Sequence, residues 1–286
     1  MQDEINHFLQ RVFDEDIKDG DHSSLACIPH DAKSSAKLLV KEDGLLAGVE
    51  LAQLIFHFID PELIVDVFVE DGKKVNIGDV AFHVHGSSQN ILKAERTVLN
   101  CMQRMSAIAT KTNAMVKLLD GLSTKVLDTR KTTPGVRFIE KWAVRIGGGT
   151  NHRFGLYDMI MLKDNHIDYA GGIEMAIEKT NRYLKENGKN LKIEIETRNL
   201  EEVKEVLRLG KIDRIMLDNF SYEDIRTAVV LIDGKYETEA SGGITMTTAR
   251  EYAECGVDFI SVGALTHSVH NMDLSLKAFT PTSVIN

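Results

Sequence analysis

The sequence is poor in cysteine and proline, and it has no long apolar run. Its three cysteines, Cys27, Cys101 and Cys255, are widely spaced, which argues against a disulfide-stapled fold and offers no zinc-ligand spacing. No stretch approaches the ~18 consecutive apolar residues of a membrane-spanning helix. The acidic start lacks the basic and apolar regions of a secretory signal. We therefore expect a cytoplasmic protein without membrane segments.

Basic residues are fewer than acidic ones, with 34 Lys and Arg and 43 Asp and Glu, which gives a formal net charge of −9. This balance argues against nucleic acid as the main partner, since nucleic-acid binding needs a basic surface. Basic residues nevertheless concentrate in 125–166, where eight Lys and Arg against four Asp and Glu give a local balance of +4. A basic segment in an acidic protein predicts a cleft that attracts a small compound rich in phosphate or carboxylate groups.

The first third of the chain is predicted to mix helices with an antiparallel sheet. Helical patterns mark 2–15, 50–58, 89–120 and 272–279. Residues 35–49 predict two strands around a Glu-Asp-Gly turn, and polar and apolar residues alternate in 66–86. The segment 89–120 predicts one or two helices that link this part to the rest. The last helical segment is expected to return to the first domain.

From residue 124 onward, short β-branched or apolar runs alternate with helical stretches, and each run ends in a charged residue, a serine or a glycine. The runs end at Arg130 and Lys131, Lys163, Glu196, Asp218, Ser241 and Gly263. Strand–helix alternation predicts a parallel sheet, either in an α/β barrel or in an open doubly wound fold. Because the carboxyl ends of barrel strands meet on one face, we expect these residues to surround one pocket.

A series of motifs gives the chain a family resemblance. They are LNCMQRMSAIAT (99–110), LDTRKTTPGVR (127–137), GGGTNHRFGLYD (147–158), LKDNH (162–166), IEIE (193–196), IMLDN (215–219), EASGG (239–243) and SVGALTHS (261–268). Their order and wording resemble the quinolinate phosphoribosyltransferase family over nearly the whole chain. The resemblance implies an α/β fold, with an N-terminal open sandwich in 1–112 and an incomplete, seven-stranded TIM-like barrel in 113–269. A C-terminal helix in about 270–286 would return to the sandwich.

The resemblance also implies an activity. Quinolinate and phosphoribosyl pyrophosphate would give nicotinate mononucleotide, pyrophosphate and carbon dioxide, a step of NAD biosynthesis that requires Mg²⁺. The pyrophosphate would hold most of the Mg²⁺ coordination, with Glu196 and Asp218 as further candidate ligands. The family forms homodimers, or a hexamer of dimers, in which Arg104 would act across the interface.

The residues suit this chemistry. Quinolinate is a dianion, and arginine binds carboxylates with two parallel hydrogen bonds. A carboxylate near the ribose stabilises the positive charge that develops in the transition state. We predict catalytic roles for Lys131, Glu196 and Asp218. The expected substrate-binding residues are Arg104, Thr129, Arg130, Lys131, His152, Arg153, Lys163, Glu196, Asp218, Ser241, Gly242, Gly243, Val262, Gly263, Ala264 and His267.

Several alternatives stay open. Lys163 fits a Schiff-base lysine of a barrel aldolase, and Glu196 and Asp218 fit caps of the helices that follow them. A related enzyme that acts on nicotinate, or an inactive protein that binds phosphorylated metabolites, would share the scaffold. His83 and His85 would share a strand face, but without a third ligand we interpret them as surface histidines.

Overall fold

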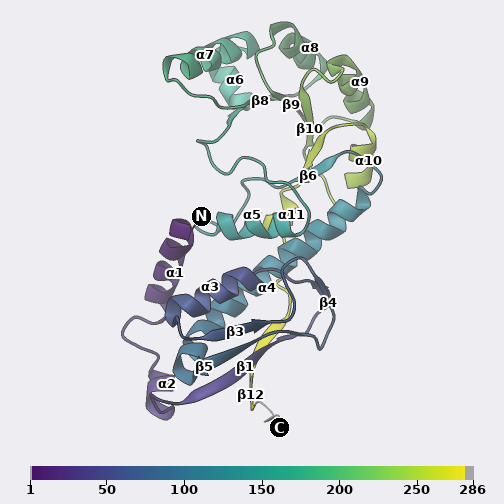
Figure 1. Ribbon diagram of the computed structural model, residues 1–286. Helices are drawn as coiled ribbons and strands as arrows, with labels where there is room; N and C mark the ends of the chain where they lie inside the picture. The colour runs from purple at the N-terminus through teal and green to yellow at the C-terminus, as the bar shows by residue number, and fades with distance from the viewer. Residues whose placement is uncertain (1, 281–286) are drawn as a thin grey trace. The chain divides into compact units, whose positions relative to one another are not determined.

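The computed structural model describes residues 2–280, which form two compact units (Figure 1). The first unit takes in residues up to 113, residues 133–148 and residues from 268 onward, and the second takes in 114–132 and 149–267. The segment 133–148, expected in the barrel, thus groups with the first unit. Its helix α5 (Arg137–Ile146) places Phe138 edge-on against Phe8, with ring centroids 5.5 Å apart.

The first unit contains a four-stranded antiparallel sheet in the order β12-β1-β5-β3 and a separate β2-β4 pair. Besides α5, its elements are α1 (Gln2–Asp16), α2 (His22–Cys27), β1 (Lys33–Val40), β2 (Gly44–Leu45), α3 (Val49–Ile59), β3 (Ile64–Val67), β4 (Lys74–Val75), β5 (Val80–Ser87), most of α4 (Ser88–Leu118) and β12 (Leu274–Phe279). Helix α3 packs on the sheet through Phe56, whose ring meets Phe82 of β5 edge-on at 5.9 Å.

The helices predicted for 2–15 and 50–58 are confirmed as α1 and α3, and 89–120 forms the single 31-residue helix α4. In the described part of the chain, no helix is both long and apolar enough to span a lipid bilayer. The helix predicted for 272–279 is wrong. Leu274–Phe279 forms strand β12, in which Leu274 and Leu276 are buried and alternate with more exposed residues, and it pairs antiparallel with β1. Residues 281–286 lie outside the described part.

The two histidines of β5 have contacts of their own in the first unit. Nδ1 of His85 lies 2.6 Å from the Ser35 hydroxyl, and its Nε2 lies 3.2 Å from Asp66. The His83 ring packs against Phe279, with centroids 4.4 Å apart. Both ring nitrogens of His85 therefore have polar neighbours within the first unit.

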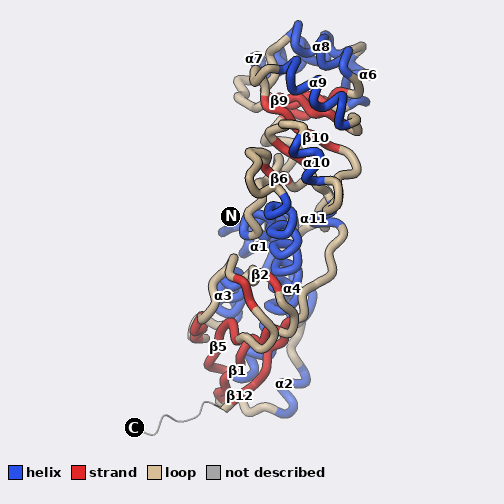
Figure 2. Tube along the Cα trace, turned by 90° about the vertical axis from the view of Figure 1, so that its right-hand side faces the viewer, coloured by secondary structure: helices blue, strands red, loops and turns tan. Residues whose placement is uncertain are grey.

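The second unit is a TIM-like barrel of parallel strands in the order β6-β11-β10-β9-β8-β7. Its elements are β6 (Lys125–Leu127), β7 (Ile160–Leu162), α6 (Asp164–Ala170), α7 (Ile173–Glu186), β8 (Ile193–Thr197), α8 (Leu200–Leu209), β9 (Arg214–Asp218), α9 (Tyr222–Ile232), β10 (Glu237–Ser241), α10 (Ala249–Glu254), β11 (Phe259–Ser261) and α11 (Ala264–His267). Helices α7, α8 and α9 lie along the outer side of the strands (Figures 1 and 2). In place of the seventh strand, Thr150 forms a single parallel bridge with Leu127.

Side chains alternate along each barrel strand between the helices and the barrel interior. On β8, Ile195 and Thr197 are fully buried, as expected for the face that the helices cover. Glu194 and Glu196 occupy the other positions and therefore face the interior. The same alternation directs Met216 and Asp218 inward on β9.

Candidate active site

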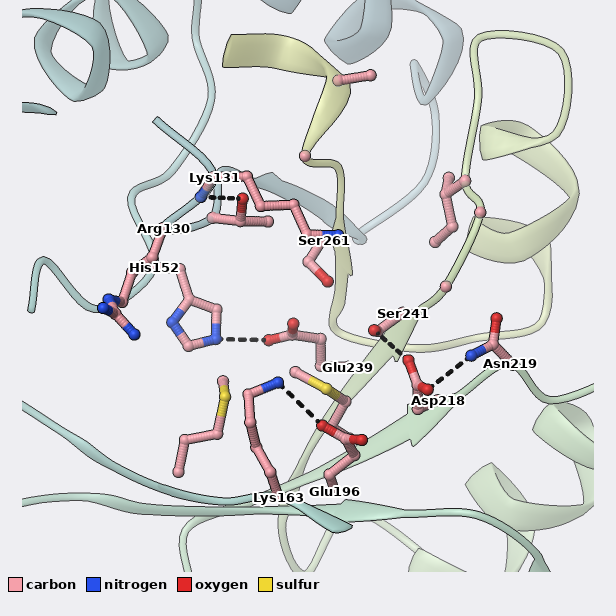
Figure 3. Close-up of a pocket in the computed structure, with 18 of the residues that line it drawn as sticks. Arg130, Lys131, His152, Lys163, Glu196, Asp218, Asn219, Glu239, Ser241 and Ser261 are labelled. Atoms are coloured by element: carbon pink, nitrogen blue, oxygen red, sulfur yellow. Dashed lines mark hydrogen bonds and ion pairs between the residues drawn. The ribbon is translucent and has the colours of Figure 1, made fainter. Parts of the chain in front are cut away.

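A cavity of about 860 Å³ lies at the carboxyl ends of the barrel strands (Figure 3). Every predicted site residue except Arg104 and Val262 lines it. The predicted residues brought together here are Thr129, Arg130, Lys131, His152, Arg153, Lys163, Glu196, Asp218, Ser241, Gly242, Gly243, Gly263, Ala264 and His267. The strand ends thus meet around one pocket within the second unit.

Two predicted residues lie elsewhere. The Val262 side chain is buried, and its backbone N–H donates to the Leu127 carbonyl, which continues the strand pairing beyond β11. Arg104 belongs to the first unit. Its guanidinium donates to the fully buried carboxylate of Glu140 through Nε at 3.1 Å and Nη2 at 2.8 Å.

Four long cationic side chains reach the pocket from the segments that follow β6, from the loop before β7 and from the end of β7. Burial and the neighbouring charge of Arg130 lower the pKa of Arg153, whose Nη1 donates to the Met159 carbonyl at 3.2 Å. Lys131 passes over Gly263, where a Cβ atom would lie only 2.9 Å from Lys131 Cδ. Glycine at position 263 therefore leaves the space that the lysine needs.

Two carboxylates stand at the ends of β8 and β9. Burial raises the pKa of Glu196, and Lys163, whose Nζ lies 3.2 Å from Glu196 Oε2, partly offsets this effect. The Asp218 carboxylate accepts hydrogen bonds from the Ser241 hydroxyl at 2.7 Å and from the Asn219 amide at 2.6 Å. Both acids are thus fixed in the pocket by neighbouring strand ends rather than left as mobile surface groups.

The loop after β10 has the backbone conformation of an anion site. Gly242 and Gly243 both have positive φ angles, of 98° and 60°. A side chain at Gly242 would collide with the side chain and backbone N of Asn219, whereas nothing lies near Gly243. The loop therefore passes close beneath Asn219 and leaves its outer backbone open. Such glycine-rich turns let backbone N–H groups approach phosphate oxygens.

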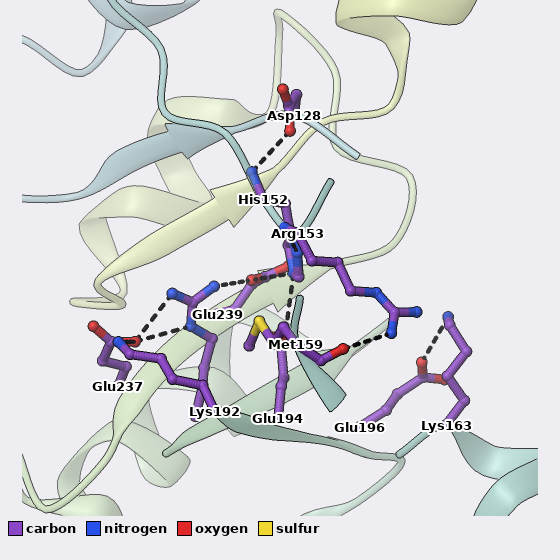
Figure 4. A network of polar contacts seen from close by, with 11 residues as sticks. Asp128, His152, Arg153, Met159, Lys163, Lys192, Glu194, Glu196, Glu237 and Glu239 are labelled. Atoms are coloured by element: carbon purple, nitrogen blue, oxygen red, sulfur yellow. Dashed lines mark hydrogen bonds and ion pairs between the residues drawn. The ribbon is translucent and has the colours of Figure 1, made fainter. Parts of the chain in front are cut away.

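Beneath the pocket lies a buried charge network that the motifs did not reveal (Figure 4). Nε2 of His152 lies 2.9 Å from Glu194 Oε2 and 3.3 Å from Glu239 Oε2, and both glutamate side chains are fully buried. Arg214 contacts Glu239 at 2.9 Å and Glu237 at 3.0 Å. Burial together with the neighbouring charge of Glu239 raises the pKa of Glu194 to about 7. These residues place opposite charges in the barrel interior.

The two-residue alternation of side chains along a strand could have predicted which way these glutamates face. Glu194 precedes Glu196 by two residues, and Glu239 precedes Ser241 by two, so each faces the same side as its partner. A charge two positions before a site residue on a buried strand therefore faces the interior beneath the site. The further lining residues not predicted from the motifs are Met161, Met216, Asn219, Glu239, Ile244, Thr245 and Ser261.

The barrel and its pocket define the class of protein. Cationic side chains, two fixed carboxylates and a glycine turn meet at the carboxyl ends of parallel strands, where barrel enzymes carry their active sites. Such a pocket is built to hold a strongly anionic substrate and to stabilise positive charge beside it. The chain is therefore an enzyme of the parallel α/β barrel class that acts on a polyanion.

Comparisons with known proteins give the family. Residues 108–277 match the profile of the quinolinate phosphoribosyl transferase C-terminal domain, and residues 21–106 match that of the N-terminal domain. The chain therefore belongs to the quinolinate phosphoribosyltransferase family, in agreement with the resemblance of its motifs.

Individual relatives match nearly the whole of this chain and most of their own lengths. A chloroplastic nicotinate-nucleotide pyrophosphorylase [carboxylating] of Oryza sativa is 46% identical over 97% of this chain and 78% of its own length. A probable enzyme of the same name from Bacillus subtilis is 42% identical over 95% of this chain and 91% of its own. The crystal structure of NadC from Streptococcus pyogenes superposes with a TM-score of 0.91 at 38% identity, and covers 98% of this chain and 99% of its own.

Proposed function

We propose that this pocket transfers the phosphoribosyl group of phosphoribosyl pyrophosphate to the ring nitrogen of quinolinate and releases pyrophosphate and carbon dioxide. The product is nicotinate mononucleotide, a precursor of NAD. The observation that carries the proposal is the convergence of Arg130, Lys131, Arg153 and Lys163 with Glu196 and Asp218 on one cavity. Family membership supports the choice of substrates.

The pyridine is proposed to bind through its two carboxylates. The charge of Arg130 lowers the pKa of Arg153, so the two guanidinium groups repel each other, and a dianion bound between them would relieve that repulsion. Guanidinium groups also match carboxylates in geometry, whereas a monoacid such as nicotinate would leave one cation uncompensated. This difference favours quinolinate over nicotinate as the substrate.

Glu196 and Asp218 are proposed to act on the ribose. As pyrophosphate leaves, the anomeric carbon gains positive charge, which a nearby carboxylate stabilises more strongly in the transition state than in the ground state. Lys163 holds Glu196, and Ser241 holds Asp218, so neither acid needs to reorient as charge develops. Once the ring nitrogen carries the ribose, the pyridinium accepts the electron pair left by the departing carboxylate.

The phosphates and the metal ion are proposed to meet near the glycine turn. Gly242, Gly243 and the start of α11 would give backbone N–H groups to phosphate oxygens. Mg²⁺ prefers oxygen ligands and usually combines one or two carboxylates with substrate phosphates. The Glu196 and Asp218 carboxylates fit this donor set, and the bound ion would neutralise charge on the leaving pyrophosphate.

The active assembly is proposed to be a homodimer, alone or within a hexamer of dimers, located in the cytoplasm without nucleic-acid or membrane partners. Arg104 would then complete the pocket of the neighbouring subunit. Glu140 supports this role, because it accepts from Arg104 and also from the Thr133 hydroxyl at 2.8 Å, which fixes the guanidinium on the first unit.

Subunit mixing tests this arrangement. Arg104→Ala and Lys131→Ala enzymes should each be inactive, but a heterodimer of the two has one complete site if Arg104 acts in trans. Random exchange of equal amounts should restore about one quarter of wild-type activity. Exchange is verified with two affinity tags. Full exchange without recovered activity would mean that each site is built from one chain.

Substrate preference tests the proposed reaction. Purified enzyme with phosphoribosyl pyrophosphate and Mg²⁺ should release pyrophosphate with quinolinate, and much more slowly with nicotinate. Faster turnover of nicotinate would support the alternative enzyme, and tight binding without turnover of either acid would support an inactive binding protein.

A further inference from the structure

The proposed reaction makes no use of Glu194 and Glu239, although both are fully buried next to His152 and Glu239 lines the cavity. Burying two carboxylates is costly unless they are paired. Arg214 donates to Glu239 at 2.9 Å, whereas Oε2 of Glu194 approaches Nε2 of His152 at 2.9 Å. Of the described polar atoms, Glu194 Oε1 is among the few buried ones that lack a hydrogen-bond partner. The costly burial of these two carboxylates therefore suggests that they have a function.

A metal site is one candidate, because the ligand atoms of His152, Glu194 and Glu239 lie within 4.8 Å of one another. The imidazole argues against it. Although burial opposes it, the contacts with Glu194 and Glu239 raise the pKa of His152 to about 9, which alone would favour a doubly protonated ring. The backbone N–H of Arg153, however, donates to Nδ1 at 2.6 Å, and an Nδ1 that accepts this hydrogen bond carries no proton, which places the ring proton on Nε2. Nε2 is the atom that faces both carboxylates, and a metal ion there would have to displace its proton and leave the ring with none, because Nδ1 is occupied as an acceptor.

Contacts on both sides fix the His152 ring. Glu194 and Glu239 lie at its Nε2 edge, and its own backbone N–H donates to the buried carboxylate of Asp128 at 2.8 Å. Its Nδ1 accepts the N–H of Arg153, the residue proposed to bind quinolinate. The two glutamates therefore connect through one rigid ring to the backbone of a substrate-binding arginine (Figure 4).

Charge acts in the same direction as these contacts. Arg130 repels Arg153, whereas Glu194 attracts it. Burial raises the pKa of Glu194 to about 7, whereas, despite burial, the contact with His152 lowers the pKa of Glu239, so the glutamate pair keeps negative charge near Arg153 before the dianionic substrate arrives. Without that negative charge, Arg153 would lower its electrostatic free energy by moving toward solvent. Quinolinate would then have to bring the Arg153 side chain back into place when it binds.

We propose that Glu194 and Glu239 are positioning residues that hold the Nε2–H form of His152 and, through it, fix Arg153 for the quinolinate carboxylates. This inference rests on the proposed function. Glu194 does not line the cavity, and Glu239 reaches its wall beside His152. They act by keeping the cationic side of the pocket assembled while it is empty, so their effect falls on quinolinate and spares the phosphoribosyl donor.

Isothermal titration of Glu194→Gln tests the proposal. This isosteric change removes the charge, and we expect the quinolinate Kd to rise roughly 10- to 100-fold. The Kd of phosphoribosyl pyrophosphate should stay near the wild-type value. Glu237→Gln is the matched control, since Glu237 bonds the same Arg214 but does not touch His152. Its quinolinate Kd should change by no more than about twofold. Equal losses for both substrates in Glu194→Gln would overturn the proposal.

A double-mutant cycle tests the route through Arg153. If Glu194 acts by placing that guanidinium, Glu194→Gln should add little to the loss caused by Arg153→Ala. Additive losses would show that the two side chains act independently. If the wild-type enzyme turns over quinolinate but the cycle is additive, this inference is refuted and the proposed function is retained.

Nitrogen-15 NMR of histidine-labelled wild-type protein measures the protonation of each ring nitrogen directly. It does not depend on substrate binding by a variant. His152, assigned by its loss in His152→Gln, should show an unprotonated Nδ1 and a protonated Nε2 in the empty enzyme. Two protonated nitrogens would contradict the proposal. So would a stoichiometric metal ion that is present after purification and lost from Glu194→Gln.

Discussion

Glu196→Gln is expected to lower kcat by roughly 100- to 1000-fold while quinolinate still binds. The carboxylate stabilises positive charge on the ribose only as pyrophosphate leaves, so its loss falls on the transition state. The change also frees Lys163 from its 3.2 Å contact with Glu196, and the extra positive charge should keep quinolinate affinity at or above the wild-type value. Steady-state kinetics and calorimetry together measure both effects.

Glu202→Gln is the matched control for this prediction. Glu202 is a glutamate in the first turn of α8, the helix that follows β8, and it pairs with Arg198 at 2.8 Å, but it does not line the pocket. Its kcat should stay close to wild type. If Glu196→Gln raised KM for either substrate with kcat unchanged, Glu196 would be a ground-state binding group and the electrostatic role would be refuted.

Arg153→Ala is expected to raise the Kd of quinolinate by roughly 100-fold, because a partly buried guanidinium that binds a carboxylate is lost. Binding of phosphoribosyl pyrophosphate should change only a few-fold. Arg153→Lys should recover little, since an ammonium cannot bind both carboxylate oxygens in the same plane. Calorimetric titration with each substrate separates the two affinities.

Arg198→Ala provides the comparison for Arg153. Arg198 follows β8, and its guanidinium pairs with Asp168 and Glu202 outside the cavity lining. Removing it also costs one positive charge in the same unit, so a general loss of positive field would appear in both variants. If Arg153→Ala weakened both substrates equally and the fold were retained, Arg153 would not be the carboxylate-binding residue.

Much of the site followed from the position of charges at strand ends. The apolar runs that end in Lys163, Glu196 and Asp218 predict three buried strands, which are β7, β8 and β9. The parallel arrangement of these strands then brings their ends together. The glycine turn was also readable, since Ser241-Gly242-Gly243 follows a strand and only glycine tolerates the backbone found there.

Other features depend on distant contacts that local patterns do not contain. Strand β12 has too few residues to distinguish strand alternation from helical periodicity. Its structure is decided by pairing with β1, which lies near the other end of the sequence. Similarly, Phe138 directs α5 to the first unit through its contact with Phe8, although α5 lies between barrel strands in sequence.

The buried network shows a third kind of limit. Glu194 and Glu239 are readable as inward-facing, but their meeting with His152 depends on barrel register, which pairs Glu194 with Arg214 and Arg214 with Glu237 across β8, β9 and β10. Register between parallel strands is set by the packing of whole strand–helix units. A single strand therefore predicts which side a charge faces but not which charge it meets.

The most direct test of the account follows one carbon atom. Wild-type enzyme receives phosphoribosyl pyrophosphate, Mg²⁺ and quinolinate labelled in the carboxylate next to the ring nitrogen. We expect the label to leave as carbon dioxide, with one pyrophosphate released for each labelled molecule and an unlabelled nicotinate mononucleotide formed. Label retained in a nucleotide, or no release of either product by correctly folded enzyme, would contradict it.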